Sequence, residues 1–424
     1  MISKGLPGFR DFFPEEFALR AHIFRVWREV ASRYGFEEYD GPPLEPLDLY
    51  TTKSGDEIVG QLYNFTDKGD REVALRPEMT PTLARMVGAR ANGLKKPIRW
   101  FSIPQLFRYE RQQRGRLREH FQLNCDLLGE AGPLADAEII ALAIDMMRAF
   151  GLGPADVRVK ISDRRTVVSA IEAVTKIPEA TPAILRAFDR LGKDRAGAEA
   201  MLADELTPPL MASVLSLVGP FTGAIPTDSH LGRTIRGVED LGLGDWLDVD
   251  MTIVRGLAYY TGTVFELFDA KGELRAICGG GRYDNLLASL GGSDLPAVGF
   301  GMGDVVLGEL LKDRGLHPAA PSSIEVFVAS VTPDDVAEVL RVAHLLRDAG
   351  IRVEYAFTNA AVGKQLTLAN TRGARVAVVI GPDDRARNEA QIKDLKTKTQ
   401  ESVSRSEIVA RVSSLVSHSP INHG

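Results

Sequence analysis

Residues 98–129 read IRWFSIPQLFRYERQQRGRLREHFQLNCDLLG, and the predicted fold is organised around them. Apolar and aromatic residues alternate with polar ones on both sides of Arg114-Gly115. This two-residue period is typical of half-buried antiparallel strands. The pattern predicts two strands, a turn at the Arg-Gly pair and a third strand.

The predicted hairpin is rich in arginine. Six arginines stand against one acidic residue, Glu110, between residues 99 and 118: Arg99, Arg108, Arg111, Arg114, Arg116 and Arg118. A guanidinium matches phosphate oxygens in pairs, so the cluster indicates a grip on a polyphosphate. The alternative is a solvated, salt-bridged edge hairpin. Against it, Gln122, Asn124 and Asp126 alternate on one strand face, as in a strand that lines a pocket.

Three segments of this stretch resemble motif 2 of the class II aminoacyl-tRNA synthetases, specifically of histidyl-tRNA synthetases: Phe107 to Arg111, the Arg-Gly-Arg loop and Phe121-Gln122. The resemblance covers nearly the full chain. It implies an α+β core, an antiparallel sheet with flanking helices, plus a helical insertion and a C-terminal α/β domain of the anticodon-binding type. The expected domains are the first part of the catalytic core with motifs 1 and 2 (1–162), the insertion (163–247), the second part of the core with the histidine signature and motif 3 (248–315) and the anticodon-binding domain (324–424).

Length and composition set the broad class. At 424 residues the chain is too long for one ordinary core, so we expect two or three domains. The 44% hydrophobic and 25% charged residues are typical of a soluble globular protein. A net charge of −6 excludes a generally basic nucleic-acid coat, and any RNA contact must be a local patch.

Cysteine usage and the N-terminus concern redox state and location. Cys125 and Cys278 are far apart, with no Cys or His at ligand spacing, so we expect two buried apolar side chains, no disulfide framework and no zinc site. The N-terminus lacks an apolar secretory segment, and no apolar run reaches membrane-spanning length. We therefore expect a cytoplasmic protein without membrane contact.

The N-terminal region predicts a helix followed by a strand. Pro14 suits a first helical turn, apolar residues recur at helical spacing, and the helix ends at Tyr34-Gly35. Residues 36–39 then predict a strand that is stopped by prolines. This order resembles class II motif 1, with Pro42 at its hallmark proline, and implies a homodimer.

Residues 61–65 and 72–75 predict a hairpin whose second strand leads into Arg76-Pro77-Glu78, and Pro81 opens a helix through Arg90. Ligand groups are common where strands run into loops, although a lone Arg-Pro-Glu is weak support. The segment resembles the substrate segment of histidyl enzymes. That resemblance implies that Glu78 and Thr80 hold the amino group of the free amino acid.

A second chemical region is expected where a strand over 248–254 runs into Arg-Gly-Leu-Ala-Tyr-Tyr at 255–260. The run resembles the signature of histidyl enzymes. The resemblance implies that Arg255 contacts the α-phosphate at the reacting centre and that Tyr259 and Tyr260 shape the histidine pocket. Ala258 stands where the family usually has an acid.

The glycine-rich segments match neither a P-loop nor a dinucleotide fingerprint. A strand at 275–277 is expected to lead into the glycines of 278–284, and three adjacent glycines suit close approach to a ligand or a neighbouring strand. Residues 278–284 and 299–303 resemble the family's glycine strand and motif 3. Val306 replaces the arginine that covers ATP in the family, and a valine cannot pair with phosphate. Residues 118–121 also transpose the usual order of aromatic and histidine near the adenine site.

The remaining regions carry less chemistry. Residues 163–247 predict helices with breaks at 177–178, 207–209 and 219–220 and no recognisable chemistry. In the family this insertion lies over the acceptor arm of the tRNA, and a plain structural insertion is an equal alternative. Residues 310–323 predict a linker, followed by a small α/β domain with a mainly parallel sheet. Its basic residues are either a solvated face or an RNA site.

Taken together, the resemblance implies a histidine-tRNA ligase that forms histidyl-adenylate from histidine and ATP and transfers it to tRNA(His). The implied catalytic residues are Arg108 and Arg255, and Mg²⁺ is expected to arrive with ATP. Histidine would contact Glu78, Thr80, Gln122, Asp126, Tyr259 and Tyr260, and ATP would contact Arg108, Glu110, Arg116 and Arg255. The partners are tRNA(His), ATP, L-histidine and a second copy of the chain. Val306 and Ala258 favour an alternative, a non-catalytic paralogue that acts as a histidine sensor or a regulatory subunit of histidine biosynthesis.

Overall fold

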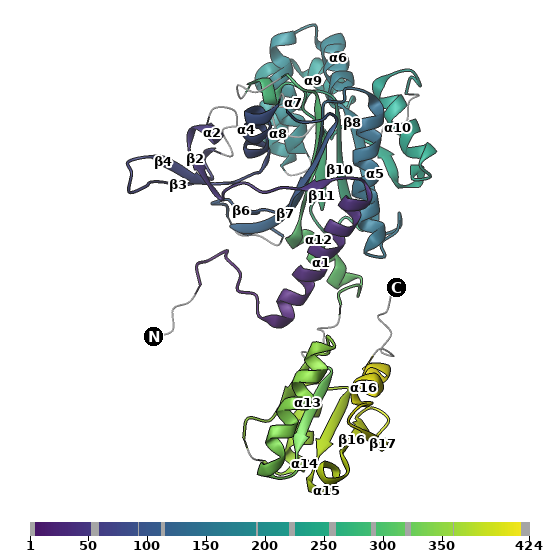
Figure 1. Cartoon of the computed structure of the whole chain (residues 1–424). Helices are drawn as coiled ribbons and strands as arrows, with labels where there is room; N and C mark the ends of the chain where they lie inside the picture. The colour runs from purple at the N-terminus through teal and green to yellow at the C-terminus, as the bar shows by residue number, and fades with distance from the viewer. Residues whose placement is uncertain are drawn as a thin grey trace. The chain divides into compact units, whose positions relative to one another are not determined.

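The computed structural model describes residues 5–51, 59–91, 93–111, 115–191, 194–219, 225–253, 260–289, 294–318, 324–358 and 360–416. The chain divides into two compact units, Met1–Pro318 and Ala319–Gly424 (Figure 1). The boundary between them falls inside the predicted linker. The finer division of the first unit at residues 162 and 247 stays a prediction.

The main sheet of the first unit has nine strands among the described residues, in the order β1-β5-β7-β12-β11-β10-β8-β9, with β6 paired to β7. All neighbours are antiparallel except β1 with β5 and β8 with β9. The strands are β1 (Glu37–Glu38), β5 (Ile98–Ser102), β6 (Gln105–Phe107), β7 (Glu119–Leu128), β8 (Val157–Asp163), β9 (Leu247–Val249), β10 (Thr263–Asp269), β11 (Cys278–Arg282) and β12 (Ala297–Gly303). The expected antiparallel sheet, centred on the arginine-rich hairpin, is confirmed.

A smaller sheet carries the Arg-Pro-Glu segment. It has the order β2-β4-β3, with β2 (Leu44–Pro46), β3 (Tyr63–Thr66) and β4 (Glu72–Leu75). The turn between β3 and β4 is held by Asp67, whose carboxylate accepts hydrogen bonds from the backbone amides of Gly69 (2.7 Å) and Arg71 (3.1 Å). The predicted hairpin is therefore confirmed, and β4 ends one residue before Arg76.

Helices cover the main sheet, and three of them, α1, α5 and α12, pack together over one face (Figure 1). Among the described residues of the first unit, the helices outside the insertion are α1 (Pro14–Arg33), α2 (Asp48–Thr51), α4 (Thr80–Arg90), α5 (Pro133–Ala149), α11 (Leu286–Ser289) and α12 (Asp304–Asp313). Trp27 of α1 is 0% exposed. Its replacement by alanine would cost about 3–5 kcal/mol, because the cavity adds to the lost burial. Cys125 and Cys278 are buried, as expected.

The region from 163 to 247 contains the expected helices, namely α6 (Arg164–Thr175), α7 (Thr181–Leu191), α8 (Arg195–Glu205), α9 (Pro208–Leu215) and α10 (His230–Asp240), with the 3-10 helices η1 (Pro178–Ala180) and η2 (Gly244–Trp246). Their buried side chains, such as Phe188 and Leu202, join the same hydrophobic core as the sheet. Helix α10 lies against α5, and a Cβ on Gly237 would fall 2.8 Å from the Cβ of Ala137. Only glycine permits this close helix contact.

Three boundary predictions were wrong. The strand expected to run to residue 254 ends at Val249, because the carboxylate of Asp250 turns the chain by accepting hydrogen bonds from the amide (3.0 Å) and hydroxyl (2.6 Å) of Thr252. The strand expected at 275–277 starts at Cys278, so the glycines themselves form it. The linker expected from Leu310 is helical through Asp313, because Leu310 and Leu311 are fully buried.

The second unit has the strand order β14-β13-β15-β16-β17. Its elements are β13 (Val326–Ser330), η3 (Pro333–Asp335), α13 (Val336–Asp348), β14 (Val353–Tyr355), α14 (Val362–Thr371), β15 (Val376–Ile380), α15 (Pro382–Arg387), β16 (Glu389–Asp394), β17 (Gln400–Ser404) and α16 (Ile408–Val416). Pairings of β13 with β14 and β15 are parallel, but β16 pairs antiparallel with both neighbours. The prediction of a mainly parallel sheet was therefore only half right. Strands β16 and β17 form an antiparallel hairpin, and the alternation of residues along a strand does not distinguish a hairpin from a crossover connection.

Among the described helices, none combines the length and the apolar composition that a membrane span requires.

Candidate active site

The hairpin of β6 and β7 joins the arginine-rich segment to the Arg-Pro-Glu segment. In the register of the hairpin, Phe107 lies opposite Glu119, and the amide of Arg108 donates to the carbonyl of Arg118 at 2.9 Å. The Nε of Arg108 donates to the carbonyl oxygen of Pro77 at 2.9 Å. The predicted phosphate-binding arginine thus lies directly beside the predicted amino-group site.

The two other described residues of the predicted ATP site pair with each other. Arg116 and the buried Glu110 form an ion pair, with Nη2 of Arg116 donating to Oε1 of Glu110 at 2.6 Å. The guanidinium of Arg118 lies over the ring of Tyr109, 4.1 Å from its centroid. Arg114 lies outside the described residues. These pairings hold the arms of the hairpin together beside Arg108.

Strand β12, which pairs with β7, has glycines beside the face of β7 that carries Gln122, Asn124 and Asp126. Asp126 lies opposite Gly299 in the pairing register, and a Cβ on Gly299 would fall 2.2 Å from Oδ1 of Asp126. A Cβ on Gly301 would fall 2.8 Å from Cδ of Gln122. Any residue larger than glycine at positions 299 and 301 of β12 would clash with these polar side chains.

Asp126 is the buried carboxyl group of this face. Its Oδ1 accepts a hydrogen bond from the hydroxyl of Tyr283. Burial raises the pKa of Asp126 to about 7, although the hydrogen bond from Tyr283 opposes the shift. The buried phenol of Tyr260 lies in the same apolar cluster as Tyr283. A carboxyl with this pKa, bonded to Tyr283, can accept a hydrogen bond from a ring nitrogen.

Glu78 and Thr80 lie at the start of α4. Glu78 is only 5% exposed, and Thr80 is the first residue of the helix. Arg76 serves a structural task instead. Its buried guanidinium donates to Oδ1 of Asp40 (2.7 Å) and to the carbonyl of Gln105 (3.0 Å). The segment is therefore anchored at Arg76, and Glu78 is placed at a helix N-terminus, where backbone amides and a carboxylate together form a polar site.

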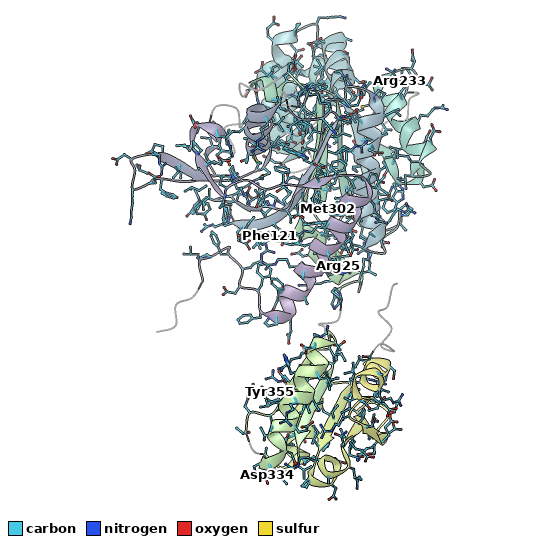
Figure 2. The ribbon with its side chains drawn as sticks, in the orientation of Figure 1. Arg25, Phe121, Arg233, Met302, Asp334 and Tyr355 are labelled. Atoms are coloured by element: carbon cyan, nitrogen blue, oxygen red, sulfur yellow. The ribbon has the colours of Figure 1, made fainter. Side chains whose placement is uncertain are left out.

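His120, to which the sequence pattern assigned no role, lies on the same strand face as Gln122. Phe121 points the other way, toward α1, where its ring centroid is 5.2 Å from that of Phe24 (Figure 2). Burial, and then the charges of Arg108, Arg10 and Arg116, lower the pKa of His120 to about 3. The transposed order noted in the sequence therefore places a neutral imidazole, and not a phenylalanine, beside the arginines. Strand alternation alone could have predicted this.

Arg10 and Asp304 form a second feature that sequence reasoning missed. Arg10 bonds Oε1 of Glu119 (2.6 Å) and Oδ2 of Asp304 (2.9 Å), and the amide of Phe121 donates to Oδ1 of Asp304 (2.9 Å). The N-terminal segment, β7 and α12 are thereby joined. No local motif marks Arg10, because its partners are more than 100 residues away.

Val306, which stands at the arginine position of motif 3, is 8% exposed. A Cβ on Gly115 would fall 3.2 Å from Cγ2 of Val306, so this side chain packs under the base of the hairpin loop. Two predicted site residues, Arg255 and Tyr259, lie outside the described residues. Tyr260, at the end of that run, is described and 7% exposed.

A cavity of about 680 Å³ lies elsewhere, between the N-terminal part of α5, helix α10 and the end of β7. Its wall includes Leu127, which points away from the face of Gln122 and Asp126, and the exposed arginines Arg233 and Arg236 of α10. Figure 2 labels Arg233. None of the predicted site residues lines it. This cavity is therefore distinct from the candidate active site.

Comparisons with known proteins identify the family of the chain. The family model for Histidyl-tRNA synthetase matches residues 8–303, and the model for Anticodon binding domain matches residues 325–415. A histidine-tRNA ligase of Opitutus terrae is 46% identical, covering 96% of this chain and 98% of its own length. One of Leptospira biflexa is 39% identical, covering 97% and 98%.

Solved structures include the histidyl-tRNA synthetase from Nostoc sp. PCC 7120, with a TM-score of 0.80, 25% identity and coverage of 98% of this chain and 100% of the other. The match extends over both units and includes the sheet, the helices and the C-terminal α/β fold. The chain belongs to the histidyl-tRNA synthetase family.

Proposed function

We propose that this chain is a histidine-tRNA ligase, which activates histidine with ATP and transfers it to tRNA(His). One observation carries the assignment of the site. The hydrogen bond from Arg108 to the carbonyl of Pro77 joins a phosphate-binding arginine to the Glu78 segment, beside the polar face of β7. A group suited to a polyphosphate therefore lies next to the segment suited to an ammonium, and Asp126 on the face of β7 offers an acceptor for a ring nitrogen.

In the first step, a carboxylate oxygen of histidine attacks the α-phosphorus of ATP, and the bond to diphosphate breaks. Arg108 and Arg255 stabilise the negative charge that develops on the phosphoryl oxygens. In the second step, the terminal ribose hydroxyl of the tRNA attacks the carbonyl carbon of the adenylate, loses its proton and releases AMP. The chain contributes mainly position and preorganised charge.

Histidine is held at both ends in this proposal. Glu78, Thr80 and Gln122 bind its amino group, and Asp126, Tyr259 and Tyr260 surround its imidazole. Because Asp126 is buried and its pKa is about 7, an apolar competitor would leave this carboxyl without a partner. The site thus favours histidine, because other amino acids would leave the buried carboxyl of Asp126 without a hydrogen bond.

ATP lies between the hairpin arginines in the same proposal. Arg116 is released from Glu110 to meet the β- and γ-phosphates, and the neutral ring of His120 offers a flat surface beside them. In the described part of the chain, no cluster of three His, Cys, Asp or Glu side chains could enclose a metal ion. Mg²⁺ that arrives with ATP would neutralise charge on the phosphates.

The further partners are tRNA(His) and a second copy of the chain. In the second unit, Arg375, Arg385 and Arg387 form ion pairs with acidic residues, whereas Lys396 and Lys398 are exposed at the β16–β17 turn. Their place at one turn supports a local RNA contact. The motif 1 dimer rests on the sequence resemblance, with Pro42 at the hallmark proline.

The burial of Val306 favours a second candidate function, a histidine-binding paralogue without catalysis. A valine packed under the hairpin loop cannot cover ATP. Histidine-dependent exchange of pyrophosphate into ATP, measured with Mg²⁺ and no tRNA, separates the two functions. Exchange that needs histidine supports the ligase, and histidine binding without exchange supports the paralogue.

Two variants of the same hairpin sharpen this experiment. Arg108→Ala removes the guanidinium that contacts Pro77, and Arg111→Ala removes an exposed one. The ligase proposal expects loss of exchange in the first variant and near-normal exchange in the second. Equal exchange in both variants would contradict the role of Arg108.

A further inference from the structure

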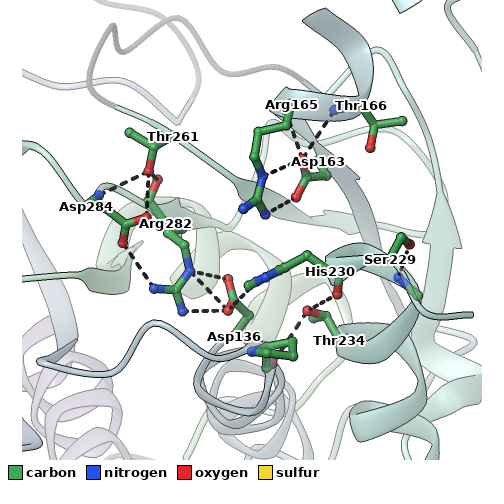
Figure 3. Close-up of polar contacts among 12 residues, drawn as sticks. Asp136, Asp163, Arg165, Thr166, Ser229, His230, Thr234, Thr261, Arg282 and Asp284 are labelled. Carbon is green, nitrogen blue, oxygen red and sulfur yellow. Dashed lines mark hydrogen bonds and ion pairs between the residues drawn. The ribbon is translucent and has the colours of Figure 1, made fainter. Parts of the chain in front are cut away.

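A buried polar network links helix α10 to the segments that precede β10 and follow β11, where Tyr260 and Tyr283 lie (Figure 3). Its centre is Arg282 of β11, which is 1% exposed. Arg282 holds the carboxylate of Asp136 in α5 with two groups: Nε lies 3.1 Å from Oδ1, and Nη2 lies 2.6 Å from Oδ2. This fork geometry is the strongest form of a guanidinium–carboxylate pair.

On one side, the network reaches the helical region that showed no chemistry in the sequence. The Nε2 of His230, the first residue of α10, lies 3.0 Å from Oδ2 of Asp136 (Figure 3). Burial would raise the pKa of Asp136, but the hydrogen bonds with His230 and Arg282 outweigh burial and hold that pKa below its usual range. Asp136 is therefore an ionised carboxylate shared by α5, α10 and β11.

On the other side, the network reaches the backbone next to Tyr260. The carbonyl of Arg282 accepts a hydrogen bond from the amide of Thr261 at 2.7 Å. Nη1 of Arg282 bonds Oδ1 of Asp284 at 3.1 Å, and the amide of Asp284 donates to the hydroxyl of Thr261 at 3.1 Å. Arg282, Thr261 and Asp284 thus form a closed clamp around the end of β11.

The clamp holds two pocket tyrosines by their neighbours in the chain. Tyr260 precedes Thr261, and Tyr283 lies between Arg282 and Asp284 and donates its hydroxyl hydrogen bond to Asp126. A Cβ on Gly281 would fall 3.0 Å from Cδ1 of Tyr260, so these strands have little free space. A small shift of Arg282 therefore moves both tyrosines.

We propose that His230, Asp136 and Arg282 are positioning residues, through which the seating of α10 on α5 sets the affinity of the histidine pocket. The proposal rests on the proposed function, since it assumes that Tyr260 and Asp126, to which Tyr283 donates a hydrogen bond, contact histidine. None of the three residues touches the reacting atoms. Their role is to hold the clamp that orients both tyrosines.

The test compares His230→Ala, His230→Gln and a matched variant on the exposed side of the same helix, Arg233→Ala. Histidine and ATP affinities are measured separately by calorimetry on the full chain, together with the KM of each substrate in pyrophosphate exchange. We expect His230→Ala to weaken histidine binding about fivefold and to leave ATP binding within about twofold. The side-chain amide of His230→Gln can donate to Asp136, so this variant restores most of the affinity.

A double variant separates positioning from general damage. Thr261→Val breaks the far end of the clamp, and His230→Ala breaks the near end. Effects within one network are not additive, whereas independent defects add within about twofold. We expect the Kd of the double variant for histidine to exceed that of the more defective single variant by no more than about twofold.

Three results would overturn the proposal: unchanged histidine affinity in His230→Ala, an equal loss of ATP affinity, or an Arg233→Ala variant as defective as His230→Ala. Normal histidine binding in His230→Ala would leave the ligase proposal intact. Absence of histidine binding in the unsubstituted chain would overturn both proposals.

Discussion

Two buried aspartates of the first unit meet opposite electrostatic conditions. Asp126, 5% exposed on the polar face of β7, has the hydroxyl of Tyr283 as a partner, and burial raises its pKa to about 7. Asp136, 0% exposed in α5, is held by Arg282 and His230, and its pKa is lowered. Burial alone does not decide the charge of a carboxyl, because the number and charge of its donors can outweigh desolvation.

The comparison separates a carboxyl that stabilises the fold, Asp136, from one that is available to a ligand, Asp126. The hydrogen-bonding capacity of Asp136 is met within the fold, so its charge contributes to stability only while its partners remain. Asp126 keeps hydrogen-bonding capacity that a ligand can use. In the ligand-free protein, this buried carboxyl therefore lowers the free energy of unfolding. Four predictions test that contrast, from the largest expected effect to the smallest.

Replacing Arg282 with methionine should lower the free energy of unfolding by about 3–5 kcal/mol, because it leaves the Asp136 carboxylate buried without its guanidinium. Urea denaturation of the full chain, followed by tryptophan fluorescence, gives the shift in midpoint. Asp126→Asn is the matched control and should change stability far less at pH 7. If the Arg282→Met variant is as stable as the parent, the buried charge of Asp136 does not depend on the guanidinium of Arg282.

Replacing Asp126 with asparagine should lower kcat/KM for histidine by roughly 100-fold, about 3 kcal/mol, because a charge-assisted hydrogen bond to the imidazole is lost. The KM for ATP should change little. Pyrophosphate exchange at varied histidine concentration measures the effect. Equal losses for histidine and ATP would show that Asp126 supports the site as a whole and does not recognise the ring.

The pH dependence of stability gives a third test. The folded-state pKa of Asp126 is raised from 3.8 to about 7, so its contribution to stability is full below pH 4 and is lost as the pH rises through 7. Between pH 5 and pH 8, the parent should lose roughly 2–3 kcal/mol relative to Asp126→Asn. Denaturation of both proteins without histidine at the two pH values measures the difference, and parallel profiles would contradict the raised pKa.

The smallest effect should come from Tyr283→Phe, which removes only the hydroxyl that bonds Asp126. We expect about 1 kcal/mol, or a five- to tenfold increase in KM for histidine, since one hydrogen bond to a buried acceptor is lost. Asp126 should also ionise at a higher pH in this variant. A pH profile of histidine binding that matches the parent's would show that Tyr283 does not tune Asp126.

Much of the local structure could be predicted from the sequence. The antiparallel pairing of β6 with β7, the helix from Pro14, the antiparallel sheet and the strand–helix alternation of the second unit follow from periodicity and from Pro and Gly placement. The errors lie where one side chain overrides a pattern or where the pattern fits two topologies. Asp250 turns a strand early, and β16 reverses in a sheet that was expected to be mainly parallel.

The candidate site was predictable in part. Alternation along β7 placed Gln122, Asn124 and Asp126 on one face, and the same rule places His120 there. Tyr283 and His230 were out of reach, because their importance depends on partners 157 and 94 residues away. No local pattern encodes such a contact.

The sequence by itself determined the elements, the family and the residue types at the site, since these follow from local periodicity and from motifs of a few residues. Only the tertiary structure decided which buried carboxyl is neutralised by a cation and which keeps capacity for a ligand. The physical reason is that desolvation and Coulomb interactions depend on distance in space. Asp126 and Asp136 are ten positions apart in the chain, but different distant segments surround them.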